Sequence, residues 1–278
     1  MDYSCGKITP FMPLGRVRIN ASGRLLSAWF SCPEKAPERV AVLLHGLCSD
    51  AAELKDLITA LSEEGVAALA PDLPGHGESD GPMGLITLPS QLKTIGVCVD
   101  WLHLRFPFAQ VVLMGHSFGA HAVLVAASLI TPPPVLVAIV GPPRYSGENL
   151  GRLKWMIMRF IGVLTDWGET LPTGVTLRCS SSFDSRSRRF SLKTLGYAAR
   201  MDNRVAVASV PPFIDGLVVR GADDPDTTSV SVTDLFNRIG SRRKKLIEIP
   251  GAGHAPFHGR AATILAKVFS GAWNECAE

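Results

Sequence analysis

The stretch Val111-Val112-Leu113-Met114-Gly115-His116-Ser117-Phe118-Gly119-Ala120 combines three local signals. Its four leading apolar residues indicate a buried parallel strand. The strand runs directly into Gly115-His116-Ser117-Phe118-Gly119, which matches the pattern G-x-S-x-G, and the apolar run 120–130 that follows is typical of a helix. A strand, a sharp turn and a helix in this order predict that Ser117 lies at the apex of a tight turn.

The two glycines of this turn predict its geometry. A serine at so tight an apex is held in a strained backbone conformation, and larger side chains two residues to either side would clash. The turn would lift the Ser117 hydroxyl clear of the sheet edge, with the N–H groups and the positive dipole end of the next helix beneath it. We therefore predict that Ser117 is a nucleophile.

Length and composition favour one large α/β domain with an insertion. The chain has 278 residues, of which 46% are hydrophobic, so it can bury a sizeable core. The net charge of +3 is too small to indicate a nucleic-acid partner. The basic runs 186–189 and 242–245 lack interleaved aromatic residues and are typical of solvated faces.

The cysteines and the apolar runs restrict other classes. The six cysteines are scattered, without C-x-x-C or histidine-rich spacing, so we expect no metal site and no cofactor. The first residues lack an apolar signal region, and no run approaches the length of a membrane span. We expect a soluble cytoplasmic protein with free thiols and no stable membrane insertion. The sequence leaves monomer and dimer equally open.

Strand and helix patterns alternate along most of the chain. Short alternating segments at 16–20 and 25–31 predict an antiparallel hairpin. Further strands are expected at 39–44, 66–70, 111–114, 135–140, 217–221 and 245–249, and helices at 50–64, 89–106, 120–130, 229–239 and 259–273. This rhythm predicts an α/β fold with a mainly parallel central sheet and helices on both faces. Chemistry in such sheets lies at the carboxyl ends of the strands.

The rhythm breaks between Arg144 and Val210. The run 153–164 is helix-like and apolar nearly all round, so it must be covered on more than one face. We predict a mainly helical cap at 144–210, inserted into a core of 1–143 and 211–278. Trp155 and Met158, both in this run, are expected to roof an apolar pocket above Ser117 and so to bind substrate.

Two later loops supply partners for a serine nucleophile. A serine hydroxyl needs a base to remove its proton, and His254 lies in the glycine loop 250–256 just past the last predicted strand. A third group must hold the imidazole in the correct tautomer. Asp223, Asp224 and Asp226 all follow the strand 217–221, and the pattern alone leaves the choice among them open. The chain order serine, aspartate, histidine is typical of one arrangement of such triads.

At this point the chain resembles the α/β-hydrolase superfamily, from Arg39 to the C-terminus. The motifs that carry the resemblance are His45-Gly46, Gly75-His76-Gly77-Glu78-Ser79, Gly115 to Gly119, Gly221 to Asp224, and Gly253-His254. The resemblance selects Asp224 as the acid, and it places a cap or lid after the sixth core strand, where the insertion lies. The elbow and the G-H-G-x-S turn look most like monoacylglycerol-lipase-like proteins and related small serine carboxylesterases.

The resemblance implies cleavage of a small-molecule carboxylic ester with an apolar acyl part. Ser117 would attack the carbonyl, with His254 as base and then acid and Asp224 orienting it. The backbone N–H groups of Leu47 and Phe118 would hold the oxyanion, and water would release the acyl-enzyme.

Other uses of the same residues stay open. A serine at position 117 argues against dehalogenases and epoxide hydrolases, which need a carboxylate there. Acyl transfer, a peptidase of the prolyl-aminopeptidase kind and a low-turnover ligand-binding homologue remain as alternatives. We expect His45, His76 and His116 to be structural and to bond loop backbone around the site.

Overall fold

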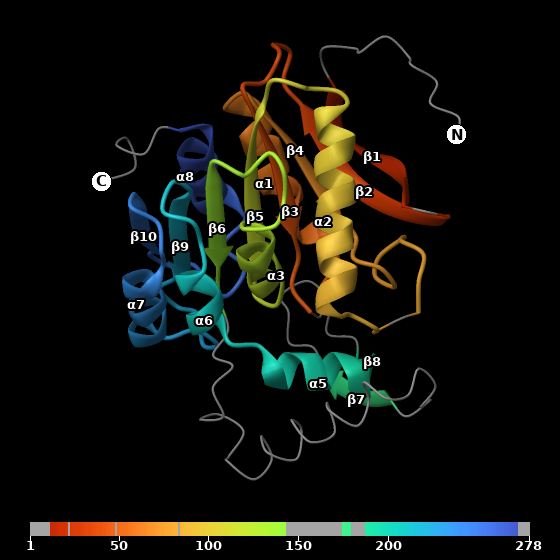
Figure 1. Cartoon of the computed structure of the whole chain (residues 1–278), viewed down its shortest axis with the longest axis vertical. Helices are drawn as coiled ribbons and strands as arrows, with labels where there is room; N and C mark the ends of the chain where they lie inside the picture. The colour runs from red at the N-terminus through yellow and green to blue at the C-terminus, as the bar shows by residue number, and fades with distance from the viewer. Residues whose placement is uncertain are drawn as a thin grey trace.

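The computed structural model describes residues 12–21, 23–47, 49–82, 84–142, 174–178 and 187–271. A twisted eight-stranded sheet with helices on both sides forms the centre (Figure 1). Its strands are β1 (Met12–Ala21), β2 (Arg24–Cys32), β3 (Arg39–Leu44), β4 (Val66–Pro71), β5 (Gln110–His116), β6 (Leu136–Val140), β9 (Asp215–Gly221) and β10 (Lys244–Ile249). The helices around it are the 3-10 turn η1 (Ala51–Leu54), α1 (Lys55–Glu63), α2 (Leu88–His103), α3 (Gly119–Ala126), α6 (Asn203–Ala208), α7 (Ser229–Arg238) and α8 (Gly259–Ser270).

The strand order in the sheet is β1-β2-β4-β3-β5-β6-β9-β10. The strands from β4 to β10 pair in parallel, while β1 and β2 form an antiparallel hairpin at one edge. The mainly parallel sheet and the hairpin were predicted from the sequence, and both are confirmed. The parallel strands bring their carboxyl ends to one edge, where the predicted site residues lie.

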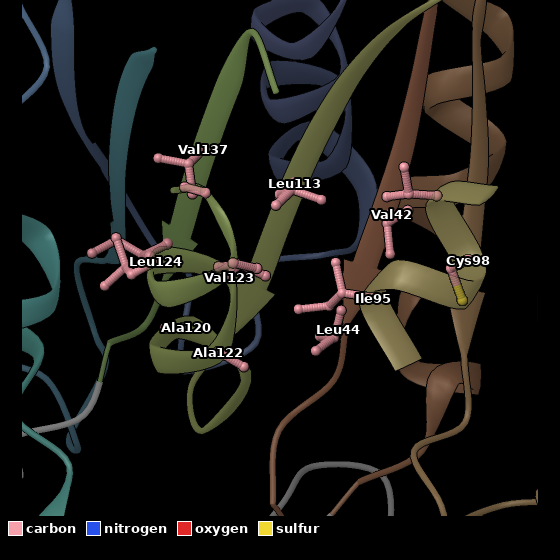
Figure 2. Close-up of a cluster of buried hydrophobic side chains, with 14 of the residues drawn as sticks. Val42, Leu44, Ile95, Cys98, Leu113, Ala120, Ala122, Val123, Leu124 and Val137 are labelled. Carbon is pink, nitrogen blue, oxygen red and sulfur yellow. The ribbon is translucent and has the colours of Figure 1, made fainter. Parts of the chain in front are cut away.

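The two faces of the sheet are buried against different helices. Val42 and Leu44 of β3 point toward α2 and α3, whereas Ala41 and Leu43 lie in a second cluster with α1 and α8. Figure 2 shows the first cluster, in which Leu113 of β5 lies between α3 and α2. Because alternate residues of a strand face opposite sides, both sets must be apolar, and this explains the unbroken apolar runs of the core strands.

The described residues of the predicted cap segment form strands as well as helices. An antiparallel pair, β7 (Gly174–Arg178) and β8 (Ser187–Ser191), leads into α5 (Leu192–Arg200). In Figure 1 these elements lie beyond the carboxyl ends of β5 and β6. The strand pair was not predicted because its sequence is short and polar and lacks the apolar run of a core strand.

Several predictions about this segment lie beyond what the structure describes. Trp155 and Met158 fall outside the described residues. Helix α6, inside the predicted segment 144–210, packs against α3 and α7 of the core. The division into a core of 1–143 and 211–278 and a cap of 144–210 stays a prediction.

Two further features concern the described residues alone. The thiols of Cys32 and Cys98 are buried, and burial raises the pKa of Cys32 to about 11. Among the described helices, none combines the length and the apolar composition that crossing a membrane requires.

Candidate active site

Ser117 occupies the strained apex that the sequence predicts. Its φ of 50° is the one positive value among non-glycine residues of the described ranges. The Ser117 N–H donates to the carbonyl of Val140 at 2.8 Å, which ties the apex to the neighbouring strand β6. A Cβ on Gly115 would lie 2.7 Å from the Cα of Ala120, and one on Gly119 would lie 3.0 Å from the carbonyl oxygen of His45. Both glycines are therefore required by close backbone approach.

A continuous chain of hydrogen bonds links Ser117, His254 and Asp224. The Nε2 atom of His254 lies 2.9 Å from the Ser117 Oγ, and its Nδ1 atom lies 2.8 Å from Oδ2 of Asp224. A carboxylate only accepts, so Nδ1 carries the hydrogen and Nε2 is left to accept from the serine hydroxyl. Three loops at the carboxyl ends of β5, β9 and β10 thus bring together residues that are far apart in the sequence.

The carboxylate of Asp224 is held on both oxygens. Its side chain is fully buried, and Oδ1 accepts the backbone N–H groups of Asp226 at 2.8 Å and Thr227 at 3.2 Å. Asp223 and Asp226 are exposed. Among the three candidate acids it is Asp224, the one that the family resemblance selects, that bonds to the imidazole.

The pKa values of the pair move in opposite directions. Burial by itself would raise the pKa of Asp224, but the hydrogen bond from His254 and the backbone donors outweigh it and lower the value. Burial by itself would lower the pKa of His254, but the bond to Asp224 and the negative charges of Asp224, Asp226 and Glu53 raise it above the ordinary value. This is the pattern of an ionised acid that stabilises a histidine when it accepts a proton.

Asp224, Asp226 and His254 also form a group of three possible metal ligands, within 4.8 Å of one another. Both ring nitrogens of His254 already face protein partners, Asp224 and Ser117. The arrangement therefore fits proton transfer better than metal binding.

The two residues predicted for an oxyanion hole flank Ser117. Phe118 is buried at the N-terminus of α3. Leu47 follows Gly46 in the loop after β3, and a Cβ on Gly46 would lie 3.3 Å from the Cβ of Ser117. The loop after β3 therefore passes directly beside the elbow, as an oxyanion loop requires.

The loop histidines contact backbone, as expected. The His45 Nδ1 donates to the carbonyl of Gly46 at 2.7 Å, and its Nε2 accepts the N–H of Leu73 at 3.0 Å. His76 donates from Nδ1 to the carbonyl of Pro74 at 3.2 Å.

Two buried acids near the site were not predicted. Asp72 has no exposed surface; it accepts from Arg16 at 2.7 Å and from the backbone N–H groups of Ala51 at 2.9 Å and Glu78 at 3.0 Å. It thereby joins the loops after β3 and β4. The second acid is Glu53, whose carboxylate lies 2.9 Å from Nδ1 of His116. Helical spacing indicates that Glu53 shares the buried face of Leu57, because it lies one helical turn before it, but no local pattern indicates its pairing with His116.

Solved structures of other proteins share this fold. Est1E from Butyrivibrio proteoclasticus, a structure with ferulic acid bound, is 21% identical over 91% of this chain and 96% of its own, with a TM-score of 0.65. A monoacylglycerol lipase from Paleococcus ferrophilus is 19% identical over 93% and 99%, with a TM-score of 0.66. A soluble variant of monoglyceride lipase from Saccharomyces cerevisiae, in complex with a substrate analog, is 14% identical over 99% of both chains, with a TM-score of 0.73.

The sequence itself matches a family model over residues 41–267. This span runs from β3 to the last helix and includes Ser117, Asp224 and His254. The family is described as alpha/beta hydrolases. The strand order, the strained serine and the family match agree, and the chain belongs to the alpha/beta hydrolase family.

Proposed function

We propose that this hydrolase is a serine esterase that cleaves a carboxylic ester with an apolar acyl part. The observation that carries the proposal is the hydrogen-bonded chain from Ser117 through His254 to Asp224, with the serine held at a positive φ. A serine in hydrogen-bond contact with a base, which in turn is oriented by a buried acid, is the arrangement that nucleophilic acyl transfer needs.

The first half-reaction forms an acyl-enzyme. The Ser117 Oγ attacks the ester carbonyl carbon while His254 takes the hydroxyl proton on Nε2. The carbonyl oxygen becomes an oxyanion, which the N–H groups of Leu47 and Phe118 would stabilise by about 3 kcal/mol each. When the intermediate collapses, the ester C–O bond breaks and His254 returns its proton to the departing alcohol.

The second half-reaction restores the enzyme. Water gives a proton to His254 and attacks the acyl-serine carbon, and the Ser117 Oγ leaves with that proton while the carboxylic acid is released. Asp224 keeps the imidazole oriented throughout and stabilises its protonated form. Each step uses only groups whose positions the structure gives, apart from the substrate and the water.

The choice of an ester with an apolar acyl part rests on three supports. The elbow Gly115-His116-Ser117-Phe118-Gly119 and the turn 75–79 resemble monoacylglycerol-lipase-like proteins. Two of the structures with this fold are a monoacylglycerol lipase and a monoglyceride lipase. The third support is the very apolar segment 153–164 of the predicted cap.

The proposal is tested with p-nitrophenyl esters of increasing chain length, an irreversible serine-directed phosphonate and mass spectrometry. We expect ester turnover, phosphonate attached to Ser117, and loss of both in Ser117→Ala. Triad members act as a unit, so the alanine variant should lose several orders of magnitude in kcat. A variant that keeps more than roughly a tenth of the activity would show that Ser117 is not the nucleophile.

The same assay separates the alternatives. A burst of p-nitrophenol without further turnover would favour the low-turnover ligand-binding protein. Cleavage of peptide amides faster than esters would favour the peptidase, and products formed mainly with an added alcohol would favour acyl transfer.

A further inference from the structure

A buried pair of polar side chains, Glu53 and His116, lies next to the predicted catalytic residues. Glu53, on η1, has a side chain 3% exposed, and His116, the residue before Ser117, has a side chain 5% exposed. The Oε1 atom of Glu53 lies 2.9 Å from Nδ1 of His116. Burying charged groups destabilises a fold unless they are well paired, and apolar residues of similar volume would often serve the fold as well. The pair therefore calls for an explanation other than packing.

The partners of His116 determine where its hydrogens lie. Its Nε2 atom is 3.0 Å from the backbone carbonyl of His254, and because a carbonyl only accepts, Nε2 must donate. Burial by itself would raise the pKa of Glu53, but the attraction of His116 outweighs it and brings the value down to about 2. His116 thus lies between the carboxyl group of Glu53 and the backbone carbonyl of His254 and is in contact with both.

This pair connects three loops that must keep their relative positions. Through Nε2, His116 holds the backbone of His254, whose ring centroid lies 5.0 Å from its own. His116 is itself part of the elbow and is followed by Ser117. Glu53 accepts the N–H of Gly46 at 3.4 Å, next to the predicted oxyanion donor Leu47.

We propose that Glu53 and His116 are positioning residues that hold the backbone of His254 so that its Nε2 stays within hydrogen-bond distance of Ser117. The inference rests on the proposed function only in taking Ser117 and His254 as the reacting pair. Neither residue needs to touch substrate, so their removal should lower the rate of attack by Ser117 and leave substrate binding unchanged. The titratable groups around the pair are His254 and His45 and, beyond His254, Asp224 and Asp226.

A double variant separates positioning from structural support. Glu53→Leu/His116→Leu removes both polar side chains, so neither partner is left buried alone, and such replacements are often neutral or stabilising. We expect a melting temperature equal to or above that of the wild type. We also expect kcat for p-nitrophenyl esters, and the rate of phosphonate labelling at Ser117, to fall about 100-fold with KM unchanged, because a displacement of about 1 Å has an effect of this size.

Two single variants complete the comparison. Glu53→Gln keeps the shape and lets His116 donate to His254 as before, so it should recover most of the labelling rate. His76→Leu is the matched control, because His76 is buried, as His116 is, and bonds a loop carbonyl that does not belong to the triad. This control should lower the melting temperature, while the rate of phosphonate labelling at Ser117 stays close to that of the wild type.

Nuclear magnetic resonance of ¹⁵N-histidine protein tests the pair without any variant. The Nε2 atom of His116 should carry the hydrogen that it donates to the backbone carbonyl of His254. A His116 whose Nε2 atom carries no hydrogen would overturn the inference, and so would a folded double variant labelled as fast as the wild type. If the wild type cleaves no ester but is labelled at Ser117, and the double variant is labelled more slowly, the proposed function fails while the positioning role stands.

Discussion

Asp224 differs from its acidic neighbours in what its two oxygens contact. Oδ2 bonds His254, and Oδ1 accepts two backbone N–H groups, so the carboxylate has one fixed orientation. Asp224→Asn keeps the shape but offers the imidazole an amide that can stabilise the wrong tautomer, and we expect kcat to fall about 10⁴-fold. Asp223→Asn and Asp226→Asn are the controls and should change kcat only slightly. Equal small losses at all three positions would place the orienting acid elsewhere.

The charge state of His254 predicts the pH dependence of ester cleavage. His254 must be neutral to accept the Ser117 proton, so kcat/KM should rise with pH as the imidazolium loses its proton. Because the pKa of His254 is raised, the midpoint of this rise should lie above the ordinary value of about 6.5.

Asp226 gives the matched comparison for this pH profile. Its negative charge helps to raise the pKa of His254, so Asp226→Asn should move the midpoint to lower pH while leaving the plateau near that of the wild type. A wild-type midpoint at or below 6.5 would show that the pKa of His254 is not raised.

A buried hydroxyl, that of Thr194, helps to fix helix α5 to the core. Thr194 has no exposed surface; its Oγ1 donates to the carbonyl of Gly84 at 2.7 Å and accepts the N–H of Ile86 at 2.8 Å. Thr194→Val keeps the shape and leaves both backbone groups without this partner, which should lower the free energy of unfolding by about 1–3 kcal/mol.

Chemical denaturation measures this effect. The control is Thr59→Val, which removes an exposed hydroxyl that donates to the Lys55 carbonyl on the surface of α1, and it should change stability far less. Equal effects of the two substitutions would mean that the buried contact does not fix α5.

At the scale of elements, the sequence predicts those features of the fold that depend on which residues are buried. The core strands are apolar on both faces, so their runs stand out, and the turn glycines follow from close backbone approach. The strands β7 and β8 were missed because they are short and polar. The region 50–64 was predicted as a single helix, whereas the structure begins it with the 3-10 turn η1 before α1.

The residues of the site likewise divide into those that the sequence predicts and those that it does not. Ser117, Asp224 and His254 follow from motifs at strand ends, and the structure brings them into contact. Glu53 belongs to no motif, and its role depends on a histidine 63 positions away in the chain. Pairings of this kind depend on the folded arrangement of the loops, which a local pattern of residues does not encode.

At the scale of the whole molecule, the described elements β7, β8 and α5 of the predicted cap segment lie at the edge of the sheet where the chemistry would occur (Figure 1). Tyr197 of α5 packs edge-on against Phe118, with ring centroids 5.2 Å apart, so the described part of the cap segment reaches the residue after the nucleophile. A cap in this position can determine which acyl groups fit.

Trp155 and Met158 test that role of the cap. Both lie outside the described residues, in an apolar run that needs cover on more than one face, and we predict that they line the acyl pocket. Trp155→Ala or Met158→Ala should therefore change the ratio of turnover on long and short p-nitrophenyl esters. Phe108→Ala is the control: Phe108 is 98% exposed and lies just before β5, at the opposite end of the strand from Ser117, so this ratio should not change. If the cap variants lose only stability and keep the wild-type ratio, these residues join cap to core and do not select the acyl chain.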